Sequence, residues 1–174
     1  MTRQHFRFLM TLLVGIFLSF SSFAAAENDP TGFWNTFDHA SGKVLSVVEI
    51  TRNAQGVYTG KIVKIMPITV DGRLQRATDV CEACKDANKN KPILGLQIIN
   101  NMVASAGTTN AGTPKEWAEG TVLDPKSGRI YSGYLQLLDN GQKLKLHGYV
   151  LGIRLLGRTE YWTRTTDPSQ AATK

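Results

Sequence analysis

Apolar and polar residues alternate along the second half of the chain. In the run KLKLHGYV at residues 143–150, the leucines and the valine fall on one face of an extended strand, and the lysines and the histidine fall on the other. A helix would instead need apolar residues three and four positions apart. The pattern predicts a half-buried antiparallel strand with one face in water.

Further runs of this kind predict a succession of strands. The turn signals DPKSG at 124–128 and DNG at 139–141 separate the apolar runs of the second half. The first half carries runs rich in valine and isoleucine. The expected strands are Gly32–Thr36, Lys43–Arg52, Val57–Met66, Leu94–Asn100, Met102–Ala104 as its extension or a separate strand, Trp117–Leu123, Arg129–Leu138, Lys143–Leu151 and Arg158–Arg164.

The segment from Met66 to Pro92 interrupts this succession. It has few large apolar residues and no clear period, and connections of this length are usually functional or mobile. Its composition is compatible with a short helix between Thr78 and Asn88. We expect the segment to cover part of the mouth of the fold.

No helices alternate with the expected strands, which leaves a closed barrel or a sandwich. Glycines at positions 60, 120, 133 and 148 lie inside apolar strands, although each costs about 0.5–1 kcal/mol relative to alanine there. Such glycines favour a barrel, because closure requires sharp bends and close strand approaches. We therefore expect an all-β fold, an antiparallel up-and-down barrel of about eight strands. Its interior would accommodate packed side chains or one small ligand.

The N-terminus carries the pattern of a secretory signal peptide. Arg3, His5 and Arg7 precede an apolar run at 8–20, and three alanines at 24–26 provide a cleavage site. The run is shorter than the roughly 20 residues of a spanning helix. We expect a signal peptide over residues 1–26, a barrel domain over 27–164 and a polar tail over 165–174. Cleavage near Ala26 would place the protein in the periplasm or outside the cell.

Charge and length narrow the partners. The chain has 174 residues and a formal charge of +6, and loss of Arg3 and Arg7 lowers that charge to +4. About 148 residues remain after cleavage, enough for one domain. No dense basic run or nucleic-acid motif is present, so we expect no nucleic-acid partner. A mild positive charge permits only a weak contact with envelope surfaces.

Cys81 and Cys84 are the two cysteines of the chain. In an oxidising compartment, a C-x-x-C pair favours a disulfide, which contributes roughly 2 kcal/mol for a ring of four residues. A thiol–disulfide exchange site would need a βαβ unit that the expected strands lack, although a redox role stays open. A metal site would need two more ligands, and the histidines are scattered, so we expect no metal and no other cofactor.

The two ends of the barrel domain resemble the calycin pattern of lipocalins and fatty-acid-binding proteins. The residues that carry this resemblance are Gly32-Phe33-Trp34 in the first strand and an arginine in the last. In that pattern the tryptophan packs under the arginine and closes one barrel end. Arg158 and Arg164 both qualify, and antiparallel first and last strands favour Arg164.

A narrower resemblance covers nearly the whole expected mature chain. The motifs that carry it include Ser41-Gly42-Lys43, Gly60-Lys61-Ile62, Cys81-x-x-Cys84, Leu123-Asp124-Pro125 and the run GRTEYWTR at 157–164. Together they resemble the secreted bacterial family catalogued as domain of unknown function 2147. The resemblance implies a lipocalin-like barrel in the periplasm or outside the cell, and it brings no catalytic residues. Many relatives carry a second acidic residue after Asp38, where this chain has His39.

These observations favour a binding protein for a small, largely apolar or amphiphilic ligand, such as an acyl chain or an envelope metabolite. Its binding wall would consist of residues that face the same way as the strand glycines. They are Tyr58, Ile62, Val122, Tyr131, Leu135, Leu146 and Tyr161.

The alternative is an envelope interaction or stress protein that uses the barrel as a scaffold. Its Cys81–Cys84 loop would serve as a contact or as a redox-sensitive element. We assign no catalytic residues, because no Ser/His/Asp arrangement can be assembled from spacing. Enzymatic activity and oligomeric state stay open.

Overall fold

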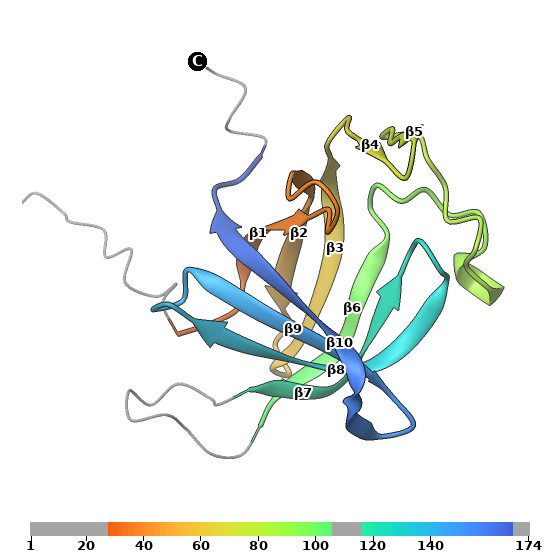
Figure 1. Ribbon diagram of the computed structural model, residues 1–174. Helices are drawn as coiled ribbons and strands as arrows, with labels where there is room; N and C mark the ends of the chain where they lie inside the picture. Colours follow the sequence, from red (N-terminus) through yellow and green to blue (C-terminus); the bar gives the residue numbers. More distant parts are fainter. Residues whose placement is uncertain (1–27, 106–115, 169–174) are drawn as a thin grey trace, which may run out of the picture.

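The computed structural model describes residues 28–105 and 116–168. Eight strands form a closed antiparallel barrel in the order β1-β10-β9-β8-β7-β6-β3-β2 (Figure 1). The predicted all-β barrel is therefore confirmed. The expected signal peptide at 1–26 and the end of the expected tail at 169–174 lie outside the described residues, as does most of the loop before β7.

The strands follow the expected apolar runs, but β10 begins at Ile153 and not at Arg158, and one strand, β6 from Gln97 to Ala104, replaces the expected Leu94–Asn100 and its extension. An extra two-stranded hairpin and a single 3₁₀ turn, η2, lie in the long connection after β3. The elements are β1 (Gly32–Phe37), β2 (Val44–Arg52), β3 (Val57–Ile65), β4 (Thr69–Val70), β5 (Arg73–Leu74), η2 (Asp86–Asn88), β6 (Gln97–Ala104), β7 (Trp117–Asp124), β8 (Arg129–Leu138), β9 (Lys143–Val150) and β10 (Ile153–Thr165).

The core fills the middle of the barrel. A Cβ atom at Gly133 would lie 2.7 Å from Cγ2 of Val122, and one at Gly120 would collide with Met102. The space beside Gly133 is thus occupied by the Val122 side chain, and the space beside Gly120 by the backbone of β6 together with the Met102 side chain. Glycine lets the strands approach, and the neighbours pack across the axis. The fully buried core side chains include Trp34, Val48, Ile50, Ile99, Met102, Leu135 and Leu144.

The long connection packs beside one end of the barrel. The predicted disulfide between Cys81 and Cys84 is present, and both cysteines are buried. Sγ of Cys81 lies 3.2 Å from the carbonyl oxygen of Pro125, in the turn between β7 and β8. An ion pair between Lys126 and Asp71 ties the same turn to the β4–β5 hairpin, and it raises the pKa of Lys126. The connection is therefore anchored to this turn.

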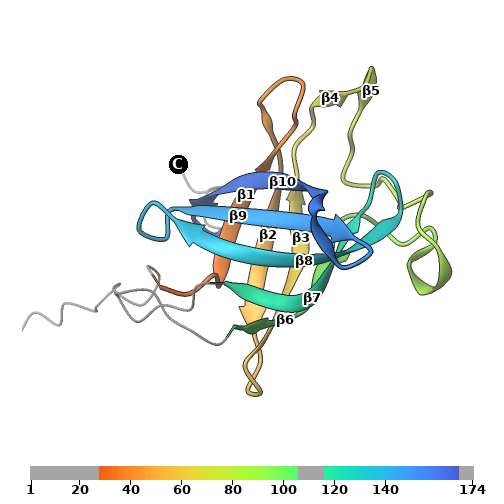
Figure 2. The ribbon, with the colours of Figure 1, turned by 60° about the horizontal axis from the view of Figure 1, so that its bottom comes forward.

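The barrel has two different ends. We call the closed end the one formed by the start of β1, the end of β10 and the β2–β3 and β8–β9 turns. The open end carries the β1–β2, β7–β8 and β9–β10 turns together with the long connection. Figure 2 shows β8, β9 and β10 crossing the direction of β1, β2 and β3.

Candidate functional site

Arg164 closes one end of the barrel. Its guanidinium carbon lies 4.2 Å from the ring centroid of Trp34, with which it is paired across β1 and β10. Its three nitrogens donate hydrogen bonds to the carbonyl oxygens of Gly141, Thr31 and Asp29, at 2.7, 2.7 and 2.9 Å. Burial lowers the pKa of this arginine. The closed end is therefore sealed by a desolvated cation and offers no entrance at this position.

The expected wall residues divide into three groups. Five of them lie in the packed interior: Tyr58, Ile62, Val122, Leu135 and Leu146. Tyr131 is half-buried near the open end, next to Gly148 on the neighbouring strand.

The inward direction expected for Tyr161 is wrong. Its side chain is 50% exposed, with Nζ of Lys143 5.2 Å from the ring centroid. Trp162 takes the buried position beside Leu144, and strand alternation then turns Tyr161 to the outside.

Three ionisable side chains meet at the open end. Oε1 of Glu160 lies 2.6 Å from Nε2 of His39 and 3.1 Å from Nε of Arg158. Glu160 is paired with Leu146, a core residue, so its backbone position belongs to the inner face of β10. We call His39, Arg158 and Glu160 the open-end triad. It places polar groups of both charge types above an apolar floor.

The β1–β2 turn holds His39 in this position. The carboxylate of Asp38 accepts hydrogen bonds from the hydroxyl and the backbone N–H of Ser41, at 2.7 and 2.8 Å. These hydrogen bonds from Ser41 lower the pKa of Asp38. Asp38 therefore organises the turn, and His39 supplies the side chain that reaches β10.

A polar pair lies on the neighbouring inner positions of β1 and β2. The hydroxyl groups of Thr36 and Ser46 are 2.7 Å apart, and both residues are buried. They face each other in the register of the two strands. The inner surface therefore changes from apolar in the middle of the barrel to polar toward the open end.

An open groove of about 520 Å³ adjoins this end. Its apolar lining comes from Leu123, Ile130, Tyr131 and Val150, and its polar lining includes residues 85–88 around η2. Tyr131 is separated from Arg158 only by Gly148, which has no side chain to fill the gap. The groove lining includes Tyr131 and none of the triad residues, so Gly148 is the link by which we treat the groove and the triad as one candidate site.

The sequence interpretation missed Glu160 and misjudged Arg158. Arg158 lies at the open end and not beside Trp34, so it plays no part in closing the barrel. The signal for both was available in β10, since an inward Trp162 implies that positions 160 and 158 share its face. Contact with His39 depends on barrel closure, which joins two segments far apart in the chain.

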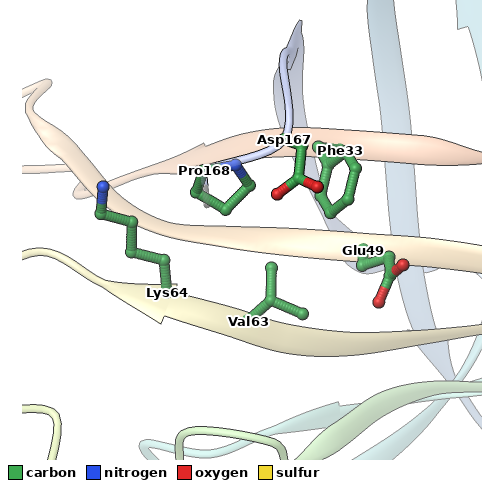
Figure 3. Close-up of a pocket in the computed structure, with 6 residues that line it drawn as sticks. All are labelled: Phe33, Glu49, Val63, Lys64, Asp167 and Pro168. Atoms are coloured by element: carbon green, nitrogen blue, oxygen red, sulfur yellow. The ribbon is translucent and has the colours of Figure 1, made fainter. Parts of the chain in front are cut away.

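A second pocket of about 360 Å³ lies on the outer face of β1, β2 and β3. Figure 3 shows Phe33, Glu49 and Val63 on the strands, with Asp167 and Pro168 of the C-terminal segment beside them. Glu49 thus points outward, where it also lies 3.5 Å from Lys61. This pocket lies on the outside of the barrel wall, and Lys64 lines it together with the acidic groups of Glu49 and Asp167.

Two further findings concern the described residues. Among them, no three or more His, Cys, Asp or Glu side chains are grouped so as to bind a metal ion. None of their helices has the length and apolar character to cross a membrane.

Comparison with known proteins agrees with this geometry. A search of curated proteins gave no match. Among solved structures, the protein HP1028 of Helicobacter pylori, described as belonging to the lipocalin family, is similar with a TM-score of 0.62 and 17% identity. The match covers 82% of this chain and 87% of that protein, and it shows the lipocalin-like fold. Residues 32–164 match the family described as "Uncharacterized protein conserved in bacteria (DUF2147)", and the chain belongs to this bacterial family.

Proposed function

We propose that the protein binds a small amphiphilic molecule, such as an acyl chain with a polar head, at the open end of its barrel. The observation that carries this proposal is the open-end triad, in which Glu160 holds an inner-face position beside the core residue Leu146 and gathers the more exposed His39 and Arg158. Ligand sites commonly combine an apolar wall with a few polar groups that fix orientation. The lipocalin-like fold is consistent with such a role.

The ligand occupies the outer part of the barrel. The middle is filled at the level of Gly120 and Gly133 by Met102 and Val122. The apolar part of the ligand therefore lies along Tyr131 and the groove, where the lining includes Ile130 and Val150. Its polar head meets the triad. Deeper entry would require Met102 to change rotamer, which methionine does more readily than branched side chains.

The triad also determines which head group binds best. Glu160 already holds Arg158 and His39, so an anionic ligand must compete with this carboxylate for the two. Replacing Glu160 with glutamine removes the competitor and retains the shape of the side chain. The variant should therefore bind anionic amphiphiles more tightly and cationic ones more weakly.

We place this function in the periplasm or outside the cell. The support is the basic and apolar N-terminal pattern together with the Cys81–Cys84 disulfide, because disulfides persist in oxidising compartments. Intact-mass measurement of the exported protein tests the location. An N-terminus near Glu27 in the periplasmic fraction is expected, and an uncleaved cytoplasmic chain would contradict it.

A fluorescent fatty acid, 11-(dansylamino)undecanoic acid, tests the binding proposal. We expect saturable binding that weakens about tenfold in Arg158→Ala, the loss of one charge-assisted hydrogen bond. The matched control is Arg52→Ala, an exposed arginine at the closed end, which should bind as the wild type does. Native mass spectrometry of the protein purified from its own compartment identifies what it carries. A bare polypeptide and equal binding by both variants would contradict the proposal.

A second candidate function is attachment to a protein partner through the long connection. The observation that favours it is the anchoring of this connection to the β7–β8 turn. The anchoring holds two exposed polar residues, Lys85 and Asp86, in a defined place. A Cys81→Ser/Cys84→Ser variant separates the candidates. Loss of a partner with unchanged probe binding favours attachment, and loss of probe binding alone favours the ligand site.

A further inference from the structure

The β9–β10 hairpin exposes apolar side chains that the barrel does not need. Leu151 is 87% exposed and Leu155 is 94% exposed, and Val150, Ile153 and Leu156 are each at least 40% exposed. We call Val150, Leu151, Ile153, Leu155 and Leu156 the leucine tip. Figure 1 shows this hairpin protruding from the barrel. A contiguous exposed apolar cluster of this kind marks an interaction site.

The backbone of the tip runs against ordinary preferences. Leu151 and Gly152 connect β9 to β10 with φ angles of 55° and 70°. A two-residue turn with both φ angles positive favours Asn-Gly, and leucine is a poor choice for its first position. The β8–β9 turn at the closed end meets the same demand with Asp139, Asn140 and Gly141. Retaining leucine in the β9–β10 turn opposes both backbone preference and solvation, which indicates a role outside folding.

A bulge in β10 creates the rest of the tip. Ile153 is paired with Val150 and Gly157 with Tyr149, so residues 154–156 have no opposite residue on β9. After the bulge, β10 resumes its pairing with β9 at Gly157. A Cβ atom at this position would lie 2.6 Å from Nε2 of His147, so only glycine allows the two strands to approach this closely. The bulge turns Leu155 and Leu156 toward solvent.

The bulge is held rigidly. The guanidinium of Arg154 donates hydrogen bonds of 2.7 and 3.0 Å to Glu116 and lies 4.6 Å from the ring centroid of Tyr134. Nε2 of His147 lies 2.7 Å from the carbonyl oxygen of Arg154. The leucines are thus displayed by a fixed scaffold. Because the scaffold is already ordered, little conformational entropy is lost when the tip is buried.

Cations surround the tip, and their acidic partners lie deeper. The side chain of Arg154 is 50% exposed against 17% for Glu116, and that of Arg158 is 67% exposed against 29% for Glu160. Arg129 at the start of β8 is also exposed and lines the groove beside Val150. The outermost charges around the leucines are therefore guanidinium groups, which attract anionic phosphates. Arg154 and Arg158 keep their pairing with Glu116 and Glu160, so direct hydrogen bonding to phosphate oxygens falls to Arg129.

We propose that the leucine tip inserts into the surface of a phospholipid bilayer that contains anionic lipids. The apolar side chains enter the acyl boundary and the surrounding arginines meet the lipid phosphates. A protruding apolar point with a cationic rim fits this surface better than a flat protein partner. The proposal does not require a bound ligand, although Val150, Arg129 and Arg158 belong to both surfaces and insertion would turn the open end toward the membrane.

Vesicle flotation tests the proposal with the chain from Glu27 onward, because the closed barrel is formed within residues 28–168. This choice removes the apolar run at 8–20 from the experiment. We expect binding to vesicles of phosphatidylcholine with phosphatidylglycerol, weaker binding to phosphatidylcholine alone, and weakening by salt. Leu151→Asn/Leu155→Ser should reduce binding about tenfold or more, since two exposed apolar side chains are lost without a change of charge.

The matched control is Leu74→Asn/Leu138→Ser, which alters two exposed leucines away from the tip. Leu151→Asn suits the turn better than leucine, so unfolding does not explain weaker binding by the tip variant. A second readout uses an environment-sensitive dye on Leu155→Cys and, for comparison, on Leu138→Cys. A blue shift with anionic vesicles only at position 155 supports insertion.

Equal binding by the tip and control variants would overturn the proposal, as would no binding by the wild type. Sedimentation without vesicles tests the remaining possibility, that a second copy of this chain binds the tip. If the wild type is a dimer that the tip variant converts to a monomer, and neither binds vesicles, the tip is an interface between two copies and membrane insertion is wrong.

Discussion

The two ends of this barrel use arginine in opposite ways. At the closed end, Arg164 is half-buried against Trp34 and donates hydrogen bonds to the backbone carbonyls of neighbouring segments, at Gly141, Thr31 and Asp29. At the open end, Arg158 is exposed and its partner is a side chain, Glu160. A desolvated arginine that joins backbone segments stabilises the fold, whereas an exposed ion pair contributes little. The difference assigns Arg164 to the stability of the fold and leaves Arg158 available for the binding role that we propose for the open end.

The same contrast holds for turns. The β8–β9 turn of the closed end is built from Asp139, Asn140 and Gly141, residues that accept positive φ angles. The β9–β10 turn of the open end places Leu151 in that conformation. The departure is specific to the β9–β10 turn, because the β1–β2 turn at the same end has Asp38, Ser41 and Gly42 in positions that suit them.

The largest expected effect comes from exchanging the two arginines for alanine one at a time. Arg164→Ala should lower the free energy of unfolding by about 3 kcal/mol, because three carbonyls lose a charged donor and Trp34 loses its cover. Arg158→Ala should cost about 0.5 kcal/mol or less. Urea unfolding followed by tryptophan fluorescence measures both. Equal losses of unfolding free energy in the two variants would contradict the distinction between the closed-end and the open-end arginine.

The disulfide provides the next effect. Cys81→Ala/Cys84→Ala should cost about 2 kcal/mol by the loop-closure estimate. Because the long connection packs against the β7–β8 turn, we expect faster amide hydrogen exchange in residues 66–96 and at this turn. Exchange at the closed end should remain slow. Faster exchange throughout the barrel would show that the connection is part of the global folding unit.

Tyr58 provides a pH-dependent effect at the closed end. Burial, followed by a hydrogen bond of 2.9 Å to Asp29, raises the pKa of its hydroxyl above the ordinary value of 10.0. The folded state therefore holds the proton more tightly, so stability is complete below pH 10 and falls as pH rises from there through the raised pKa. Tyr58→Phe should cost about 1 kcal/mol at neutral pH and flatten this alkaline decline. Chemical unfolding between pH 7 and 11 measures it, and an unchanged slope would contradict the assignment.

The smallest effect has the opposite sign. Leu151→Asn should raise the free energy of unfolding by about 0.5 kcal/mol, because asparagine accepts a positive φ angle more readily. The matched change Asn140→Leu places leucine in the closed-end turn and should lower stability by a similar amount. Thermal unfolding of the two variants measures the pair. A loss of stability in Leu151→Asn would mean that the leucine serves the fold.

Much of the architecture could be predicted from the sequence, because strand alternation is local. The run at 129–138 defines β8 to the residue, and its turns are marked by Gly128 and Asp139. The bulge at 154–156 could not be predicted, because Leu155 and Leu156 look like core residues until the register is known. A change of one position in register reverses the face of a strand, which is why Tyr161 was assigned to the wrong side.

The candidate site was less accessible to sequence interpretation than the fold. His39 and Glu160 are brought together only when β1 pairs with β10, and no local pattern encodes that contact. The apolar wall was easier to predict, since the burial of Ile62, Val122 and Leu146 follows from strand alternation alone. The wall is apolar and packed in its middle, and the polar groups that distinguish the open end depend on tertiary contacts.

The most direct test of the account is a map of backbone amide shifts during titration with 11-(dansylamino)undecanoic acid. We expect the largest shifts at His39, Tyr131 and Glu160, with Trp34 and Arg164 unchanged. Shifts concentrated at the closed end, or spread along the outer face of β1 to β3, would contradict the claim that the open end is the binding face.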